Sequence, residues 1–279
     1  VKHWQVTGAL SADPRGWTVT PAAEQTSPPS PASMAWLDRL AEGTNALEQL
    51  AVLGSAEDAV WVAALGRPLG AAVARLKAQG VVRQAHGRWF IAAPAVADAL
   101  LARAVKGGRR LGLQQAAADA LQGREDAHSL ARRGRHLLAV GRAQEAMRPL
   151  LEGGAKGTLA SGERLAVLAM ALRAMWAAGV PASDRRWLAL WAVKIEALHE
   201  REHSSAILEM LPEVEALAEA LHDSDHRWRG PFYRAVLTER DPRGALRALV
   251  AMVPEGHARG HLVLQLAWYE LLGGGVDAC

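Results

Sequence analysis

Residues 198–206, "LHEREHSSA", contain two histidines and a glutamate with the spacing of a zinc site. His199, Glu200 and His203 match the pattern H-E-x-x-H. On one helix, this spacing places both imidazoles on one face, where they can bind zinc while the glutamate acts as a general base. Glu219 is available as a third ligand in the following segment. The segment therefore raises the hypothesis of a zinc metallopeptidase.

Features of the same segment favour a structural role instead. The two variable positions of the pattern are Arg201 and Glu202, and burying an unpaired charge beneath a metal cleft costs several kcal/mol. No strand pattern precedes the segment to line a substrate cleft, and a chain with ten histidines can match by chance. We interpret "LHEREH" as the solvated end of a helix with i,i+4 pairing. The next helix then starts near Ser204 and Ser205.

Other catalytic patterns are absent from the sequence. No glycine loop of the form G-x-x-x-x-G-K-[ST] or G-x-G-x-x-G occurs, and "LLGGGVDA" lacks the lysine. Ser129, Ser161 and Ser183 lie in helix or turn contexts rather than in a nucleophile elbow. The one cysteine, Cys279, excludes an intramolecular disulfide and a cysteine-built zinc site. We therefore expect no enzymatic activity and no cofactor.

The composition limits the remaining function classes. The 279 residues are 50% hydrophobic, yet no apolar run is long enough to span a membrane. A single cysteine suits a reducing compartment, so we expect a cytoplasmic location. The net charge is +3 and arginine and glutamate are interleaved, which argues against a nucleic-acid partner. The start, "VKHWQVTG", has no initiator methionine or signal peptide, so we expect a piece of a longer chain.

The first third of the chain indicates two small lobes. Residues 1–24 predict the end of a preceding lobe, with a β-hairpin around "DPRG", and "QTSPPSPAS" at 25–33 predicts a linker. Residues 34–105 contain three short amphipathic helical patterns, and "VVRQAHGRWFIA" alternates like a hairpin around His86 and Gly87. Three helices and a two-stranded wing predict a winged-helix domain.

A winged helix can read DNA with its third helix, here "PLGAAVARLKAQG". This helix offers mostly glycine and alanine to base edges, although Arg75, Lys77 and Gln79 lie near its end. Arg83, His86 and Arg88 of the wing could contact phosphates. We favour a lobe that packs against protein and keep a DNA-binding transcription regulator as the alternative.

Residues 106–279 predict an array of helical repeats. Alanine, leucine, arginine and glutamate dominate, with breaks such as "KGG", "EGGAKG" and "GVPASD" between helices of ordinary length. "RAQEAMRPLL" and "DPRGALRALV" superpose, and their Ala146 and Ala245 lie 99 residues apart, close to three tetratricopeptide periods. Ala206 marks a candidate intermediate copy. Small residues let paired helices approach closely, as such a solenoid requires.

The aromatic residues of this array suggest a core and a binding groove. Trp176, Trp187 and Trp191 have the spacing of helix–helix contacts and are interpreted as core. Trp228, Phe232 and Tyr233 in "HRWRGPFY" are candidates for the lining of a concave groove that binds a protein or peptide.

The order of these parts resembles a segment of a known family. "AQGVVRQAHGRWFIAAPAVADALLARA" followed by "HSLARRGRHLLAVGRAQEAMRPLL" is similar to the region downstream of the nucleotide-binding domain in bacterial STAND-type signal-transduction ATPases. The family commonly has a His-Pro pair after the wing, where this chain has Ala93 and Pro94. The resemblance implies a non-catalytic regulatory and sensor segment. It would contact the nucleotide-binding domain of the parent chain and bind a protein or peptide effector through its repeats.

The expected fold is therefore mainly α: a winged-helix lobe with a small β-hairpin, followed by a tetratricopeptide-like α-solenoid. The expected role is recognition rather than catalysis.

Overall fold

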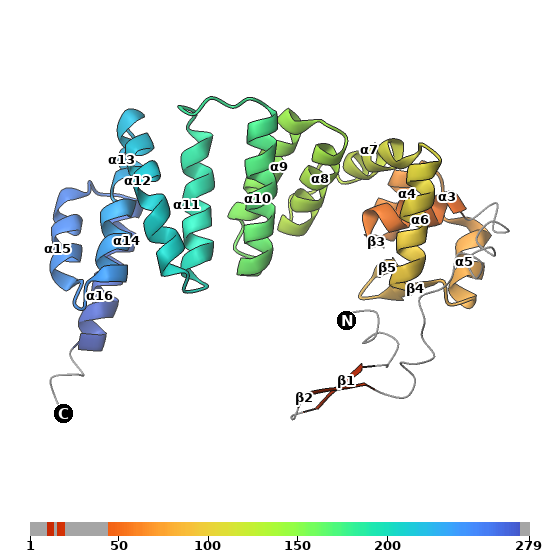
Figure 1. The fold of residues 1–279 in the computed structure, drawn as a ribbon, viewed down its shortest axis with the longest axis horizontal. Coiled ribbons are helices and arrows are strands. Elements are labelled where there is room, and N and C mark those ends of the chain that lie inside the picture. The colour runs from red at the N-terminus through yellow and green to blue at the C-terminus, as the bar shows by residue number, and fades with distance from the viewer. Residues whose placement is uncertain (1–9, 14–15, 20–43, 274–279) are drawn as a thin grey trace. The chain divides into compact units, whose positions relative to one another are not determined.

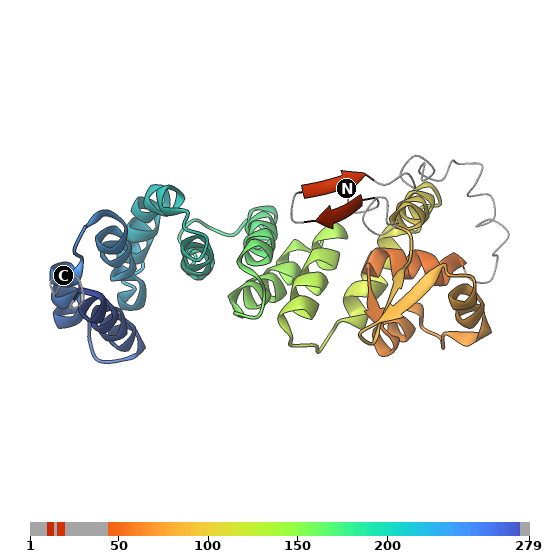
Figure 2. The same ribbon diagram turned by 90° about the horizontal axis from the view of Figure 1, so that it is seen from below.

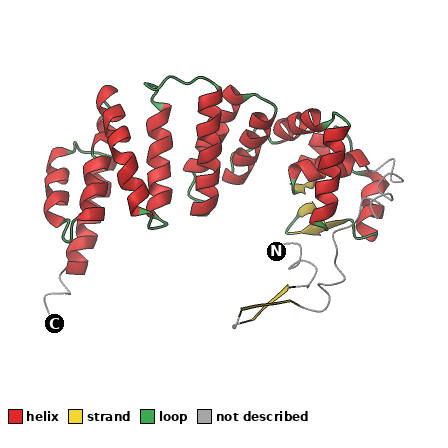
Figure 3. Cartoon of the chain, in the orientation of Figure 1, coloured by secondary structure: helices red, strands yellow, loops and turns green. Residues whose placement is uncertain are grey.

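Helices make up most of the protein in the computed structural model, which describes residues 10–13, 16–19 and 44–273. Strands are short, and they form one two-stranded and one three-stranded antiparallel sheet (Figure 3). The predicted mainly α fold with a small β component is confirmed. Among the described helices, none combines the length and the apolar character needed to cross a bilayer.

The chain divides into two compact units, residues 1–146 and 147–279. The hairpin predicted near the start is present as β1 (Leu10–Asp13) and β2 (Gly16–Val19), which pair antiparallel. The predicted linker at 25–33 and the start of the winged-helix domain at 34 lie outside the described residues.

A lobe of short helices and a three-stranded antiparallel sheet follows in the first unit (Figure 1). Its elements are α3 (Thr44–Leu53), β3 (Ala56–Glu57), α4 (Asp58–Leu65), α5 (Gly70–Ala78), β4 (Val82–Ala85) and β5 (Arg88–Ile91). The sheet order β3-β5-β4 places the last strand between the other two. The two-residue strand β3 was not predicted, because so short a strand has no alternation to read.

The wing turns at the two residues that the sequence indicated. His86 and Gly87 have φ values of 49° and 72°, and positive φ at both central residues is the geometry of the common two-residue hairpin turn. Below the wing, the predicted helical stripes form one core in which Leu47, Leu50 and Trp61 are fully buried. The indole of Trp61 donates a hydrogen bond of 3.0 Å to a backbone carbonyl of α3, which satisfies its buried N–H.

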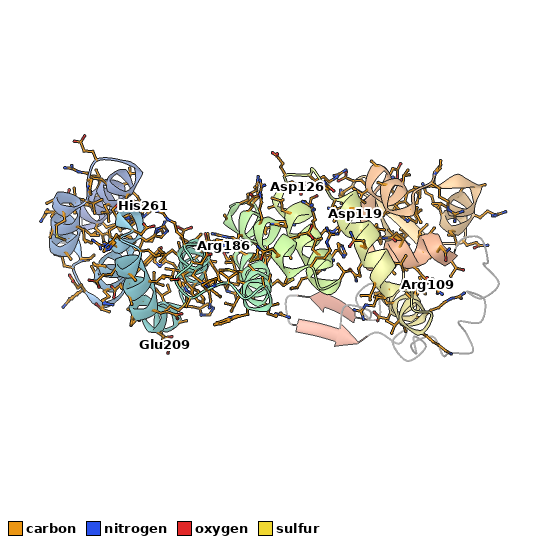
Figure 4. All side chains as sticks on the ribbon, turned by 90° about the horizontal axis from the view of Figure 1, so that it is seen from above. Arg109, Asp119, Asp126, Arg186, Glu209 and His261 are labelled. Atoms are coloured by element: carbon orange, nitrogen blue, oxygen red, sulfur yellow. The ribbon has the colours of Figure 1, made fainter. Side chains whose placement is uncertain are left out.

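Two further helices complete this core, α6 (Pro94–Lys106) and α7 (Arg110–Ala120). Glu48 of α3 is fully buried, and the Arg109 guanidinium donates to its two carboxylate oxygens at 2.7 and 2.9 Å (Arg109 is labelled in Figure 4). Arg103 of α6 lies 3.5 Å from the same carboxylate. Leu121, just after α7, is also in this core. The hydrophobic core therefore continues beyond residue 105, where the sequence suggested that the winged-helix domain ends.

Helix α8 (Ala127–Ala139) packs on α7 and carries a buried histidine. Asp126 caps the helix by accepting a hydrogen bond of 2.9 Å from the backbone N–H of Ser129. His136 is 1% exposed, and one of its ring nitrogens contacts the Gln114 amide oxygen. Burial, with help from nearby Arg135, lowers the pKa of His136 to about 3. The imidazole is therefore neutral in the folded protein at neutral pH.

The remaining helices form the predicted array. They are α9 (Ala143–Ala155), α10 (Ser161–Ala177), α11 (Arg186–His199), α12 (Ser204–Ala220), α13 (Ser224–Arg227), α14 (Arg229–Thr238), α15 (Arg243–Met252) and α16 (His257–Gly273). From α10 onward, each long helix packs on the next one along the chain, and both views show them side by side (Figures 1 and 2). The predicted breaks at 106–108, 123–126, 140–142, 152–157, 179–184, 222–225 and 253–256 lie at or close to ends of helices.

The two superposed repeat segments also bury equivalent positions. Met147 in α9 and Leu246 in α15 are 2% and 0% exposed, and the leucines three residues later, Leu150 and Leu249, are 0% and 5% exposed. Ala146 is fully buried, as the close approach of paired helices requires, whereas Ala245 is only partly buried. The burial of the larger apolar residues is therefore more similar between the two segments than the burial of the alanines.

The neutral state of His136 gives the first prediction. Its folded-state pKa lies below the unfolded value near 6.5, so the unfolded chain binds more protons between pH 6.5 and pH 3, and stability falls as the pH falls through this window. Between pH 6.5 and 5 the loss is about 2 kcal/mol. Urea unfolding at these two pH values should show this loss in the wild type. The loss should be much smaller in His136→Leu and unchanged in His128→Gln, which alters an exposed histidine of the same helix. An equal loss in His136→Leu would contradict the assignment.

Candidate functional site

The two histidines of the H-E-x-x-H match do not share a helix. Helix α11 ends at His199, and α12 begins at Ser204. Between the two helices, Glu202 has a φ of 59°, in the left-handed region. This backbone conformation ends the right-handed helix before it can reach His203. The expectation that the spacing places both imidazoles on one helix face is therefore wrong. The expectation that one helix gives way to the next at Ser204 is confirmed.

The surroundings of these histidines do not provide a metal site. His199 and His203 are exposed, and Glu219 lies in the last turn of α12, where it lines an open pocket with Glu215 and Arg227. Over the described part of the chain, no cluster of three or more histidine, cysteine, aspartate or glutamate residues could hold a metal ion. The zinc ligands that the pattern suggested are not brought together.

Glu200 instead binds a neighbouring helix. Its carboxylate accepts a hydrogen bond from the guanidinium of Arg164 in α10 and another of 2.6 Å from the Ser161 hydroxyl. The Ser161 bond is the main reason that the pKa of Glu200 is lowered; burial opposes this, and Arg164 adds to the lowering. The expected i,i+4 pairing within one helix is therefore replaced by pairing between helices.

Arg164 of α10 reaches two further helices, α9 and α11, through its side chain, which is only 6% exposed. It donates to the carbonyl of Gly154 at the end of α9 at 3.4 Å and lies 3.8 Å from Glu196 of α11. Glu196 in turn accepts a hydrogen bond of 2.9 Å from Arg229 of α14. The glutamate that suggested catalysis thus belongs to a network that holds the array together.

Three of the four candidate cations of the winged helix are exposed. Arg75 and Lys77 lie on α5 and Arg83 on β4, and the Lys77 ammonium stands 5.3 Å from the ring of Trp89. Beside the start of α5 is a cleft of about 520 Å³ that Arg67 and Arg75 help to line. The exposed positions in the first half of α5 are glycine and alanine, so they present no base-reading group.

Arg88, the fourth candidate cation, faces the protein rather than solvent alone. It is partly buried, its Nε is sealed from water, and it stands opposite Glu57 in the sheet register. It also lies close enough to Arg132 of α8 for the two positive charges to repel each other. Desolvation chiefly, and then repulsion by Arg88, lowers the pKa of Arg132 to about 10. Arg88 therefore lies on the side of the sheet that is near α8 rather than on a free surface of the hairpin.

The three tryptophans predicted to be core differ from one another. Trp187 is 4% exposed, Trp191 is partly buried and Trp176 is 68% exposed, so the prediction is wrong for Trp176. The rings form a row, with centroids 5.2 Å apart from Trp176 to Trp187 and 6.1 Å apart from Trp187 to Trp191. The ammonium of Lys194 lies 5.0 Å from the Trp191 ring.

The three aromatics predicted to line a groove are buried. Trp228, Phe232 and Tyr233 are 7%, 3% and 5% exposed and belong to the core of the second unit. Burial raises the pKa of Tyr233 to about 12. The groove interpretation is therefore wrong for Phe232 and Tyr233, while Trp228 lines one edge of a pocket.

An exposed apolar surface on α16 was not found from the sequence. Leu264, Trp268 and Leu271 are 71%, 59% and 77% exposed, and their spacing of four and three residues places them on one helix face. Leu262 on the other side of α16 is fully buried in the core. The pattern was present in the sequence, but periodicity alone does not show which of two apolar faces is covered.

The structure is that of a mainly helical protein, in which short helices with a small antiparallel sheet are followed by an array of helices. No protein-family model, curated protein or solved structure matches the chain.

A zinc titration tests the assignment of "LHEREH". Because its histidines are not held together, the purified protein should contain only substoichiometric zinc, and equimolar zinc should leave the Tm unchanged. His203→Ala should alter the free energy of unfolding by less than about 0.5 kcal/mol, since the side chain is exposed. Stoichiometric zinc that is lost in His199→Ala would restore the metallopeptidase hypothesis.

Proposed function

We propose that this chain is a non-catalytic regulatory and sensor segment that recognises a protein partner through its helical array. The observation that carries the proposal is the apolar face of α16. Of the large apolar side chains that are exposed in the described part of the chain, six of nine lie on α15 and α16. These are Met252, Val263, Leu264, Trp268, Leu271 and Leu272.

The energetics of this face support a protein partner. Helix α16 already packs on α15 through Leu262 and Leu266, so it is apolar on two sides. A helix that is apolar all round is normally buried on all sides, and contiguous exposed apolar surface marks an interaction site. Trp268 at the centre of the face is the residue type most enriched among energetically dominant interface contacts.

Site-specific photo-crosslinking in the source cells tests this role. A photoreactive residue at Leu264 or Leu271 should give one reproducible crosslinked protein, and the same residue at Glu213 of α12, an exposed polar position, should not. Adding Trp268→Glu should abolish the crosslink at Leu264 while leaving the free energy of unfolding within about 0.5 kcal/mol of the wild type, because the side chain is exposed. No crosslink at either position, or an equal one at Glu213, would overturn the proposal.

We further propose that the parent chain is a STAND-type signal-transduction ATPase, with this segment between its nucleotide-binding domain and its sensed effector. The support is the order of a winged helix and then a helical array. The test is the reading frame upstream of Val1, which should encode a P-loop of the form G-x-x-x-x-G-K-[ST]. A complete gene without one would overturn the ATPase assignment but not the recognition role.

The alternative function, DNA binding, rests on the exposed Arg75, Lys77 and Arg83. Fluorescence anisotropy with duplex DNA should show at most weak, sequence-independent binding, with a Kd on the order of 10⁻⁴–10⁻⁶ M at physiological salt. Such binding should weaken steeply as salt is raised, because it depends on counterion release. Tight, sequence-specific binding that is lost in an Arg75→Ala and Lys77→Ala double variant would favour the transcription-regulator hypothesis instead.

A further inference from the structure

A pocket of about 300 Å³ lies beside Trp228 in the second unit, where the loop between α15 and α16 approaches α13 and α14. Its wall is partly apolar, from Val253, Pro254, Ala258 and the indole of Trp228. Ser224, His226 and Arg229 add polar groups. A concave apolar wall with a few convergent polar groups is the usual form of a small-ligand site.

Two hydrogen-bond donors at this pocket have no acceptor. Among the described residues, the indole Nε1–H of Trp228 and the Nε–H of Arg229 are buried without a partner. The two side chains are in contact, with the guanidinium carbon 5.2 Å from the indole ring. A buried donor without an acceptor costs about 1–3 kcal/mol. A ligand that offers an acceptor to both N–H groups would remove this cost for each of them.

The guanidinium of Arg229 has a buried edge with an unused donor, the Nε–H. Its Nη1 donates to Glu196 at 2.9 Å, while its Nε has no acceptor, and no carboxylate among the described side chains is bonded to the edge formed by Nε and Nη2. Elsewhere in the chain the same edge makes paired hydrogen bonds to carboxylates, in Arg109, Arg186 and Arg243. Two parallel N–H donors match the two oxygens of a carboxylate.

The acidic residues nearby whose side chains are described have other partners or point to solvent. Asp223 is bound by Arg185 at 2.7 Å and by His226 at 2.9 Å, and Glu196 occupies the other end of the guanidinium. Glu255 lines the pocket, but its side chain is 94% exposed and lies 3.9 Å from Arg259.

We infer that this pocket binds a carboxylate with an apolar body, held by the Nε–Nη2 edge of Arg229 and the indole N–H of Trp228. The apolar part lies against Val253, Pro254 and Ala258, and a shift of the loop 253–256 admits the ligand to the two sealed donors. A small organic acid and the C-terminal carboxylate of a peptide share this chemistry. The inference is independent of the proposed protein contact through the exposed face of α16.

Indole N–H signals in ¹H–¹⁵N NMR spectra of the 279-residue chain test the inference. Sodium benzoate and N-acetyl-Ala-Leu with a free carboxylate are the probes, and benzamide and the corresponding peptide amide are the neutral controls. The Trp228 signal, identified by Trp228→Phe, should move downfield and saturate with a Kd on the order of 1 mM or tighter for a carboxylate, and should not move with either amide. A response to benzoate alone indicates a small organic acid as the ligand, and tighter binding of the peptide indicates a C-terminus.

Arg229→Lys keeps the positive charge near Glu196 but removes the paired donors, so it should abolish the shift. Arg227→Lys, which changes an exposed neighbour, should leave the shift intact. Unchanged signals from the other tryptophans in each variant verify that the fold is kept. The inference is overturned if neither carboxylate moves the Trp228 signal, if the amides move it equally, or if Arg229→Lys responds like the wild type.

Discussion

The buried guanidinium of Arg164 constrains much of the helical array. A charge that is 94% removed from solvent must be paired, because an unpaired buried charge costs several kcal/mol. The pairing groups come from Gly154 of α9 and from Glu196 and Glu200 at the end of α11, and through Glu196 the network extends to Arg229 of α14.

In the first unit, a buried negative charge is paired in the same way. Glu48 is fully buried, and Arg109 and Arg103 reach it from the start of α7 and from α6. The amide of Gln49 on the same helix donates 3.0 Å to a carbonyl of α7. In both units, buried charged residues therefore connect neighbouring helices through ion pairs and hydrogen bonds.

The sequence predicted the positions of helices and turns better than it predicted which side chains are buried. Glycine and proline mark nearly every break between helices, and the positive φ of His86 and Gly87 requires the turn that the alternating pattern predicted. The boundary near Ser204 was predicted, but the end of α11 at His199 was not, because Glu200 and Arg201 are good helix formers and the turn depends on Glu202 in the left-handed region. The exposure of Trp176 and the burial of Phe232 depend on which neighbouring helix covers each face, and a single sequence does not contain that information.

The central claim, that Glu200 is a tie between helices rather than a catalytic base, is tested most directly by a double-mutant cycle on Arg164 and Glu200. Urea unfolding of Arg164→Met, Glu200→Gln and the double variant should give a coupling free energy of about 1–3 kcal/mol. The exposed i,i+4 pair of Arg148 and Glu152 is the control, and its coupling should stay below about 0.5 kcal/mol. A coupling near zero for Arg164 and Glu200 would contradict the account.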